Sequence, residues 1–158
     1  MVAIKANQAR DFLKSPDPRL IAALFYGADA GLVAERAQAL AKILASVKGN
    51  PPGEVLRVDD TDLENDPGRL AVELQTIPMF GGRKIIRATA SRRISAAHLK
   101  PLLEGPPLAG FLIVEAQNLK TDDSLRSLFE KSAVAAAIAC FPDEARDLEV
   151  VLREAFAK

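Results

Sequence analysis

Five short apolar segments alternate with segments of helical periodicity along this chain of 158 residues. Segments such as 20–26 and 110–115 are apolar at nearly every position, which is typical of strands buried on both faces of a parallel sheet. A regular alternation of strand and helix favours helices packed on both faces of that sheet. We therefore predict an α/β domain of three layers with a five-stranded, mostly parallel sheet. The predicted strands are 20–26, 54–59, 83–88, 110–115 and 134–141.

The helical segments are bounded by residues that commonly start or end helices. Asp66 and Pro67 have the pattern of an N-cap followed by proline at the first helical position, and Pro78 ends the same segment. The acidic stretch 60–66 before it is predicted to be a solvated loop with capping aspartates. The predicted helices are 5–14, 31–46, 67–77, 95–104, 122–132 and 143–157.

The composition excludes several classes of protein. Lysine plus arginine total 21 and so do aspartate plus glutamate, and this zero net charge predicts no strong nonspecific affinity for nucleic acid. One cysteine and one histidine exclude an internal disulfide and leave little for a zinc site. No apolar run is long enough to span a bilayer, and the first residues lack the apolar stretch of a secretory signal. We therefore expect a cytoplasmic domain without a membrane partner.

The turn after the first predicted strand lies where a phosphate-binding loop would lie. A P-loop needs glycines followed by Lys and Ser/Thr, which contact the phosphates and magnesium. Here Gly27 and Gly31 are too close together for that motif, and Leu32 and Val33 follow instead of the required pair. Asp29 adds a negative charge to the turn. We predict a degenerate loop that binds no nucleotide; the alternative is a P-loop-type nucleotide-binding enzyme with an aberrant loop.

Other chemical motifs are incomplete. Read as an EF-hand starting at Asp60, the acidic stretch has Asn65 where glycine is needed and Ala71 where glutamate is needed. Cys140 lies in an apolar strand and is interpreted as a buried structural thiol, and His98 as a surface or hydrogen-bonded histidine. The sequence therefore predicts no catalytic residue, no metal site and no cofactor.

Five cations and no acids occur in the segment 83–93. These residues could contact nucleic-acid phosphate or an acidic partner. The alternative, which charge runs favour in general, is a solvated face that balances acids elsewhere. The five are Arg83, Lys84, Arg87, Arg92 and Arg93.

The hexapeptide 77–82 places an apolar pair, Met79 and Phe80, between a helix end and two glycines. The pair either closes the helix end onto the core or forms an exposed wedge for an apolar pocket on a partner. Methionine is adaptable and phenylalanine has a large apolar surface, so both readings fit the residue types.

Several segments together resemble the delta subunits of bacterial DNA polymerase III, which are clamp-loader components. The most specific is the stretch Phe80-Gly81-Gly82-Arg83-Lys84 after a helix. The resemblance covers the chain in the right order. The segments that carry it are 24–31, 62–70, 75–86, 112–115 and 125–131.

The resemblance implies a RecA-like, AAA+-type N-terminal domain at 1–142, followed by the first helix of a truncated helical lid domain at 143–158. Family members neither bind nor hydrolyse ATP, which agrees with the degenerate loop at Gly27 and Gly31. The related delta-prime subunits usually have a zinc-binding cysteine cluster, and the single cysteine here counts against them.

The resemblance also implies a role in DNA replication. Delta subunits bind the beta sliding clamp and help to open its ring, and they are not enzymes by themselves; the complex-level activity is that of the DNA-directed DNA polymerase. Carried over by position, the wedge is Met79 and Phe80, with Ile77, Pro78 and Arg83 around it. Leucine is common at the first wedge position, so Met79 is a mild departure. The implied further partners are the gamma/tau and delta-prime subunits, through domains missing here, and primer-template DNA in the full complex.

Overall fold

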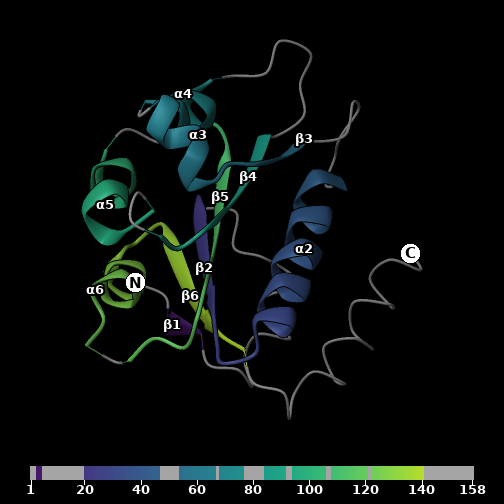
Figure 1. Cartoon of the computed structure of the whole chain (residues 1–158), viewed down its shortest axis with the longest axis vertical. Helices are drawn as coiled ribbons and strands as arrows, with labels where there is room; N and C mark the ends of the chain where they lie inside the picture. The colour runs from purple at the N-terminus through teal and green to yellow at the C-terminus, as the bar shows by residue number, and fades with distance from the viewer. Residues whose placement is uncertain are drawn as a thin grey trace.

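Six parallel strands form a single sheet in the order β1-β6-β2-β5-β4-β3 (Figure 1). The structure, a computed structural model, describes residues 3–4, 20–46, 54–66, 68–76, 84–91, 94–105, 108–120 and 122–140. All five predicted strands are present. A sixth, β1, was not predicted, because two residues are too few to show a pattern. The strands are β1 (Ala3–Ile4), β2 (Ala22–Tyr26), β3 (Glu54–Arg57), β4 (Lys84–Thr89), β5 (Phe111–Ala116) and β6 (Ala135–Ala139).

Helices lie on both faces of this sheet. The predictions of helices at 31–46, 95–104 and 122–132 are confirmed, whereas those at 5–14 and 143–157 lie outside the described residues. The described helices are α2 (Ala30–Ser46), α3 (Asp60–Asn65), α4 (Arg69–Gln75), α5 (Ala96–Glu104) and α6 (Ser124–Lys131).

The acidic stretch that was predicted to be a loop is the helix α3. The N–H of Asp62 donates to the side chain of Asp59 (3.1 Å), and the N–H of Asp59 donates to the side chain of Asp62 (3.0 Å). This reciprocal capping box satisfies two N–H groups that the helix start leaves open. The backbone hydrogen bond from Asp59 also holds the pKa of Asp62 below its usual value.

The predicted start of the next helix was also wrong. Asp66 is the C-cap of α3, where its N–H donates to the carbonyl of Asp62, and the N-cap of α4 is Gly68. Asp66 therefore ends one helix instead of starting another, because the acidic residues before it are already helical.

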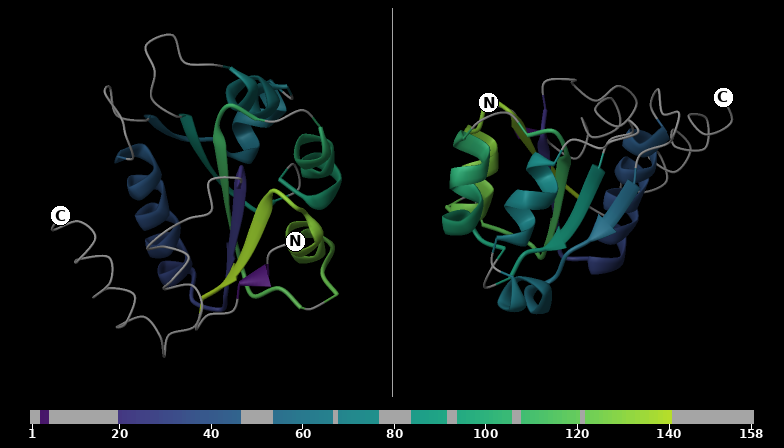
Figure 2. Two further views of the ribbon diagram at one scale, coloured as in Figure 1. Left: turned by 180° about the vertical axis from the view of Figure 1, so that it is seen from behind. Right: turned by 90° about the horizontal axis from the view of Figure 1, so that it is seen from above.

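Alternate residues of each strand face opposite layers, and this gives the predicted three-layer arrangement. In β2, Ala23 and Phe25 face the cluster under α2, whereas Leu24 and Tyr26 face the cluster under α3 to α6. The right-hand view of Figure 2 shows α2 on one side of the sheet and the other helices on the opposite side. Both faces of β2 and β5 are buried, which explains their unbroken apolar sequence.

Candidate partner-binding site

The residues predicted to contact a partner lie in one segment whose two ends are well defined. The helix α4 ends at Gln75 with Thr76 as its C-cap, and β4 begins at Lys84. The segment between them, 77–83, lies outside the described residues, so its wedge role stays a prediction. It contains Ile77, Pro78, Met79, Phe80 and Arg83.

The helix before this segment exposes an apolar side chain. Leu70 and Leu74 of α4 pack into the core, whereas Val72 is 61% exposed. Only Val55 on β3 is comparable among the large apolar residues that the structure describes. Sequence reasoning missed Val72, although its offset of two from each buried leucine places it on the opposite face of the helix.

The two described members of the basic segment form ion pairs inside the fold. Lys84 Nζ lies 2.7 Å from Glu73 Oε2, and Arg87 Nη2 lies 3.0 Å from Glu115 Oε2. The two cations are only 17% and 15% exposed, so they do not lie on a solvated face. Each instead balances a buried or half-buried carboxylate. The remaining members, Arg83, Arg92 and Arg93, lie outside the described residues.

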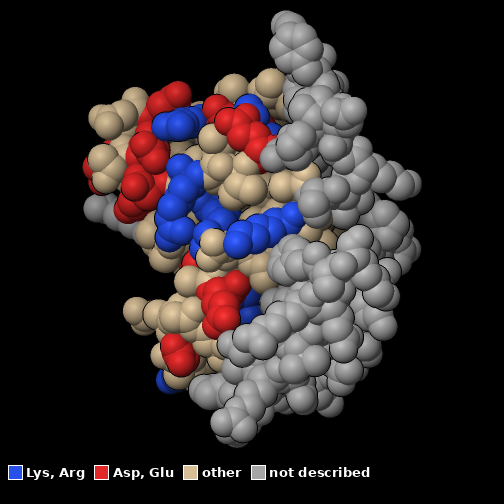
Figure 3. Space-filling view, turned by 90° about the vertical axis from the view of Figure 1, so that its right-hand side faces the viewer, with Lys and Arg blue, Asp and Glu red and all other residues tan. Residues whose placement is uncertain are grey.

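The Arg87–Glu115 pair belongs to a network at the carboxyl end of the sheet. Arg87 Nη2 also donates to the carbonyl of Ala34 in α2 (3.4 Å). Arg57 Nη1 approaches Glu115 Oε2 at 3.7 Å, and Arg57 Nη2 donates to Thr89 Oγ1 (3.2 Å). On the face shown in Figure 3, the blue basic groups are bordered by red acidic groups and do not form a surface of one sign.

In the degenerate loop, Asp29 forms hydrogen bonds with backbone N–H groups at the start of α2. Asp29 is the N-cap of α2: its carboxylate accepts from the N–H of Leu32 (3.2 Å), and its carbonyl accepts from the N–H of Val33 (3.0 Å). In P-loop proteins, free N–H groups at this helix end bind phosphate. Here a carboxylate already uses one of them, and its negative charge opposes an approaching phosphate.

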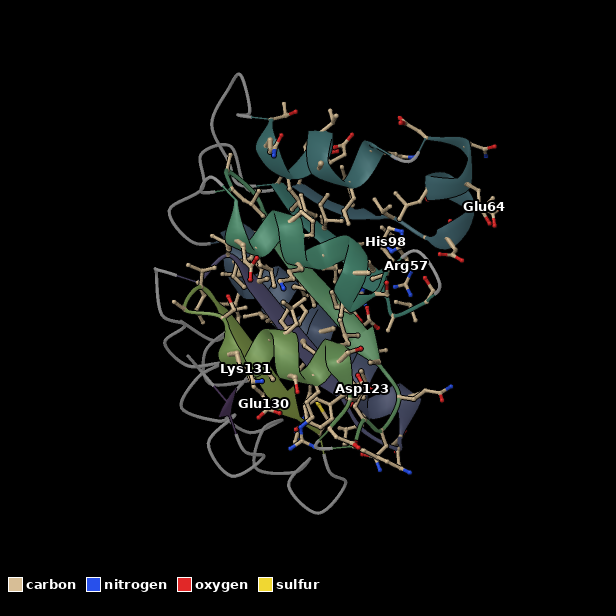
Figure 4. The ribbon with its side chains drawn as sticks, turned by 90° about the vertical axis from the view of Figure 1, so that its left-hand side faces the viewer. Arg57, Glu64, His98, Asp123, Glu130 and Lys131 are labelled. Atoms are coloured by element: carbon tan, nitrogen blue, oxygen red, sulfur yellow. The ribbon has the colours of Figure 1, made fainter. Side chains whose placement is uncertain are left out.

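The two residues with the most chemically versatile side chains are placed as predicted. Cys140 is fully buried, and burial raises the pKa of its thiol to about 11, although Arg36 beside it acts in the opposite direction. His98 lies on the exposed side of α5 (Figure 4), with its Nδ1 atom 3.0 Å from Ser95 Oγ. A buried, neutral thiol is a poor nucleophile.

Metal-binding clusters and membrane-spanning helices are both absent from the part of the chain that the structure describes. In that part of the chain, no group of three or more His, Cys, Asp or Glu side chains is arranged to hold a metal ion. None of the helices described is long and apolar enough to cross a membrane.

Comparison with known proteins identifies the fold. No protein family and no curated protein matches the sequence. Among solved structures, the chain is similar to a DNA polymerase III gamma subunit-related protein from Thermotoga maritima, with 18% sequence identity and a TM-score of 0.51. The similarity covers 90% of this chain and 48% of that protein, so the chain spans about half its length. The predicted α/β fold is thus confirmed, and it is shared with a DNA polymerase III gamma subunit-related protein.

Proposed function

We propose that this chain is a non-catalytic, delta-type clamp-loader domain that binds the beta sliding clamp of bacterial DNA replication in the cytoplasm. The observation that carries the proposal is the place of Met79 and Phe80 in the sequence, shortly after α4 ends at Gln75, in a chain whose fold is shared with a gamma subunit-related protein. Val72 adds an exposed apolar side chain to α4, the helix that precedes that segment in the sequence. Apolar anchors of this kind typically supply most of the energy of a protein interface.

The arrangement at the helix start supports a delta-type subunit over a nucleotide-binding one. Asp29 occupies the N-terminus of α2, and Leu32 and Val33 stand where Lys and Ser/Thr are required. We therefore propose that the domain contributes binding energy and leaves ATP hydrolysis to other subunits. Binding opens the clamp only to the extent that the wedge fits the opened ring better than the closed one.

The same proposal assigns the rest of the chain. Residues 1–142 form the RecA-like domain, and 143–158 begin a helical lid domain. The gamma/tau and delta-prime subunits would contact further domains of a longer protein, and primer-template DNA would be held by the assembled complex.

Replacing Met79 and Phe80 together by alanine tests the wedge. We expect the double variant to lose about 2–4 kcal/mol of clamp-binding free energy, as is typical of hot-spot anchors, with its folding unchanged. Isothermal titration of the clamp from the same organism measures the affinity, and thermal unfolding monitors the fold. Val55→Ala is the matched control, because it shortens an exposed apolar side chain on β3. Clamp affinity equal to wild type in the double variant would show that the wedge assignment is wrong.

Titration with magnesium-ATP tests the alternative of a nucleotide-binding enzyme. A ligand at 100 times its Kd stabilises the folded state by about 2.7 kcal/mol, which raises Tm by several degrees in a domain of this size. We expect Tm to change no more with magnesium-ATP than with magnesium chloride alone, because Asp29 caps the helix end that phosphate would use. A saturable rise in Tm with nucleotide would favour the enzyme.

A further inference from the structure

We propose that the groove between α5 and α6 is a docking site for an amphipathic helix of a partner protein, with carboxylates on that helix contacting Lys100 and Lys131. The groove has a volume of about 750 Å³, and the described residues that line it come from α5, from α6 and from 132–134 before β6. None of them belongs to α4 or to the segment 77–83. The proposal is therefore independent of clamp binding.

The least exposed part of the groove is apolar. Leu103 of α5 is buried, and Leu128 of α6 and Val134 are half-buried. The other apolar side chains of α6, Leu125 and Phe129, are buried in the core, so Leu128 is the one that α6 leaves for the groove. The two helices lie side by side on the face shown in Figure 4. An apolar floor between two surface helices is the geometry that receives the apolar stripe of a third helix.

The charged groups at the edge of the groove favour an acidic partner. Lys100 of α5 and Lys131 of α6 are exposed, and they line the groove from opposite helices. Neither lysine forms an ion pair with any residue that the structure describes. Glu104 is the one acid among the described lining residues, so two positive charges stand against one negative charge. Charges of opposite sign on a partner speed its association and fix its register.

Hydroxyl groups add hydrogen-bond donors to the same lining. Ser124 and Ser127 lie on α6, and Ser132 follows it. The N–H of Val134 donates to Ser132 Oγ (3.2 Å), which leaves the O–H hydrogen of that serine for another acceptor. A carboxylate accepts from ammonium and hydroxyl groups alike. Nucleic acid fits less well, because its phosphates would face an apolar floor and the carboxylate of Glu104 with only two cations to bind them.

A labelled peptide tests the groove in the full chain. The probe is a helical peptide with leucines at helical spacing and glutamates on both flanks, and the matched peptide has lysines in place of the glutamates. Fluorescence anisotropy measures both affinities. We expect wild type to prefer the acidic peptide, and K100E/K131E to bind it at least about tenfold more weakly, because like charges then face each other. Lys42→Glu is the control: it reverses an exposed charge on α2, on the other face of the sheet, and should leave the affinity unchanged.

Amide hydrogen exchange shows where the peptide binds. Exchange should slow in 96–104 and 124–134 when the acidic peptide is added. Equal affinity for the two peptides, unchanged affinity in the double variant, or slower exchange confined to other elements overturns the proposal. Sedimentation of the chain alone tests the competing occupant: self-association that K100E/K131E abolishes would show that a second copy fills the groove, and would overturn the assignment to a partner helix. A failure of clamp binding leaves all of these results unaffected.

Discussion

Replacing Glu115 by leucine should lower the free energy of unfolding by about 3 kcal/mol, because it leaves the largely buried positive charge of Arg87 without its partner. Glu115 is only 6% exposed, and its Oε2 atom accepts from Arg87 Nε (3.1 Å) and lies 3.0 Å from Arg87 Nη2. The Arg87 side chain is itself 15% exposed, so water cannot replace the lost carboxylate fully. Chemical denaturation followed by circular dichroism measures the loss.

Two further variants distinguish the stability lost with this ion pair from the stability lost with ordinary packing contacts. Arg57→Met removes the more distant and more exposed arginine of the network, and we expect it to cost only about 0–1 kcal/mol. The double variant E115L/R87M removes both charges of the buried pair and should recover most of the stability lost in Glu115→Leu. A loss below about 1 kcal/mol in Glu115→Leu would contradict the role assigned to this carboxylate.

The sequence predicted the sheet well because buried parallel strands have an unmistakable composition. Strands β2, β5 and β6 are buried on both faces, so their apolar runs show no alternation and are too short for helices. The helix α3 was missed for the opposite reason. Its residues are mostly polar, only Leu63 is buried, and its start depends on a reciprocal hydrogen bond between Asp59 and Asp62.

The ion pairs could not be predicted, because they depend on which residues the sheet places side by side. Glu115 is 28 residues from Arg87, and the two meet because β4 and β5 pair in the register Thr89↔Glu115. No local pattern in the sequence specifies that register. The basic segment was therefore visible in the sequence, whereas the ion pairs that Lys84 and Arg87 form inside the fold were not.

For the candidate site, too, some features could be predicted from the sequence and others could not. The sequence was sufficient to single out Met79 and Phe80 as an apolar pair after a helix, and this wedge remains a prediction. The exposure of Val72 and the pairing of Glu73 with Lys84 depend on how α4 packs against β4, and they required the structure.

Replacing Gly27 by alanine should destabilise the fold by about 3 kcal/mol, at the upper end of overpacking effects. A Cβ atom there would lie 2.3 Å from the carbonyl oxygen of Cys140, which is backbone and cannot rotate away. The N–H of Cys140 donates to the carbonyl of Tyr26 (2.8 Å), so the clash cannot be relieved without breaking a bond between neighbouring strands.

Gly31→Ala is the contrasting variant in the same turn. The nearest atom to a Cβ there is Asp29 Oδ1 at 3.3 Å, at the end of a side chain. Alanine is also favoured over glycine in a helix by about 0.5–1 kcal/mol, so we expect a net change within about 1 kcal/mol. Thermal unfolding of both variants measures the difference. Equal losses of stability in the two variants would contradict the structure of the turn. Gly27 lies against the backbone at the end of β6, whereas Gly31 has no backbone atom that close. That difference also explains why this loop has a glycine at position 27, where phosphate-binding loops have one too. The space that a side chain would need beside Gly27 is occupied by the backbone carbonyl of Cys140.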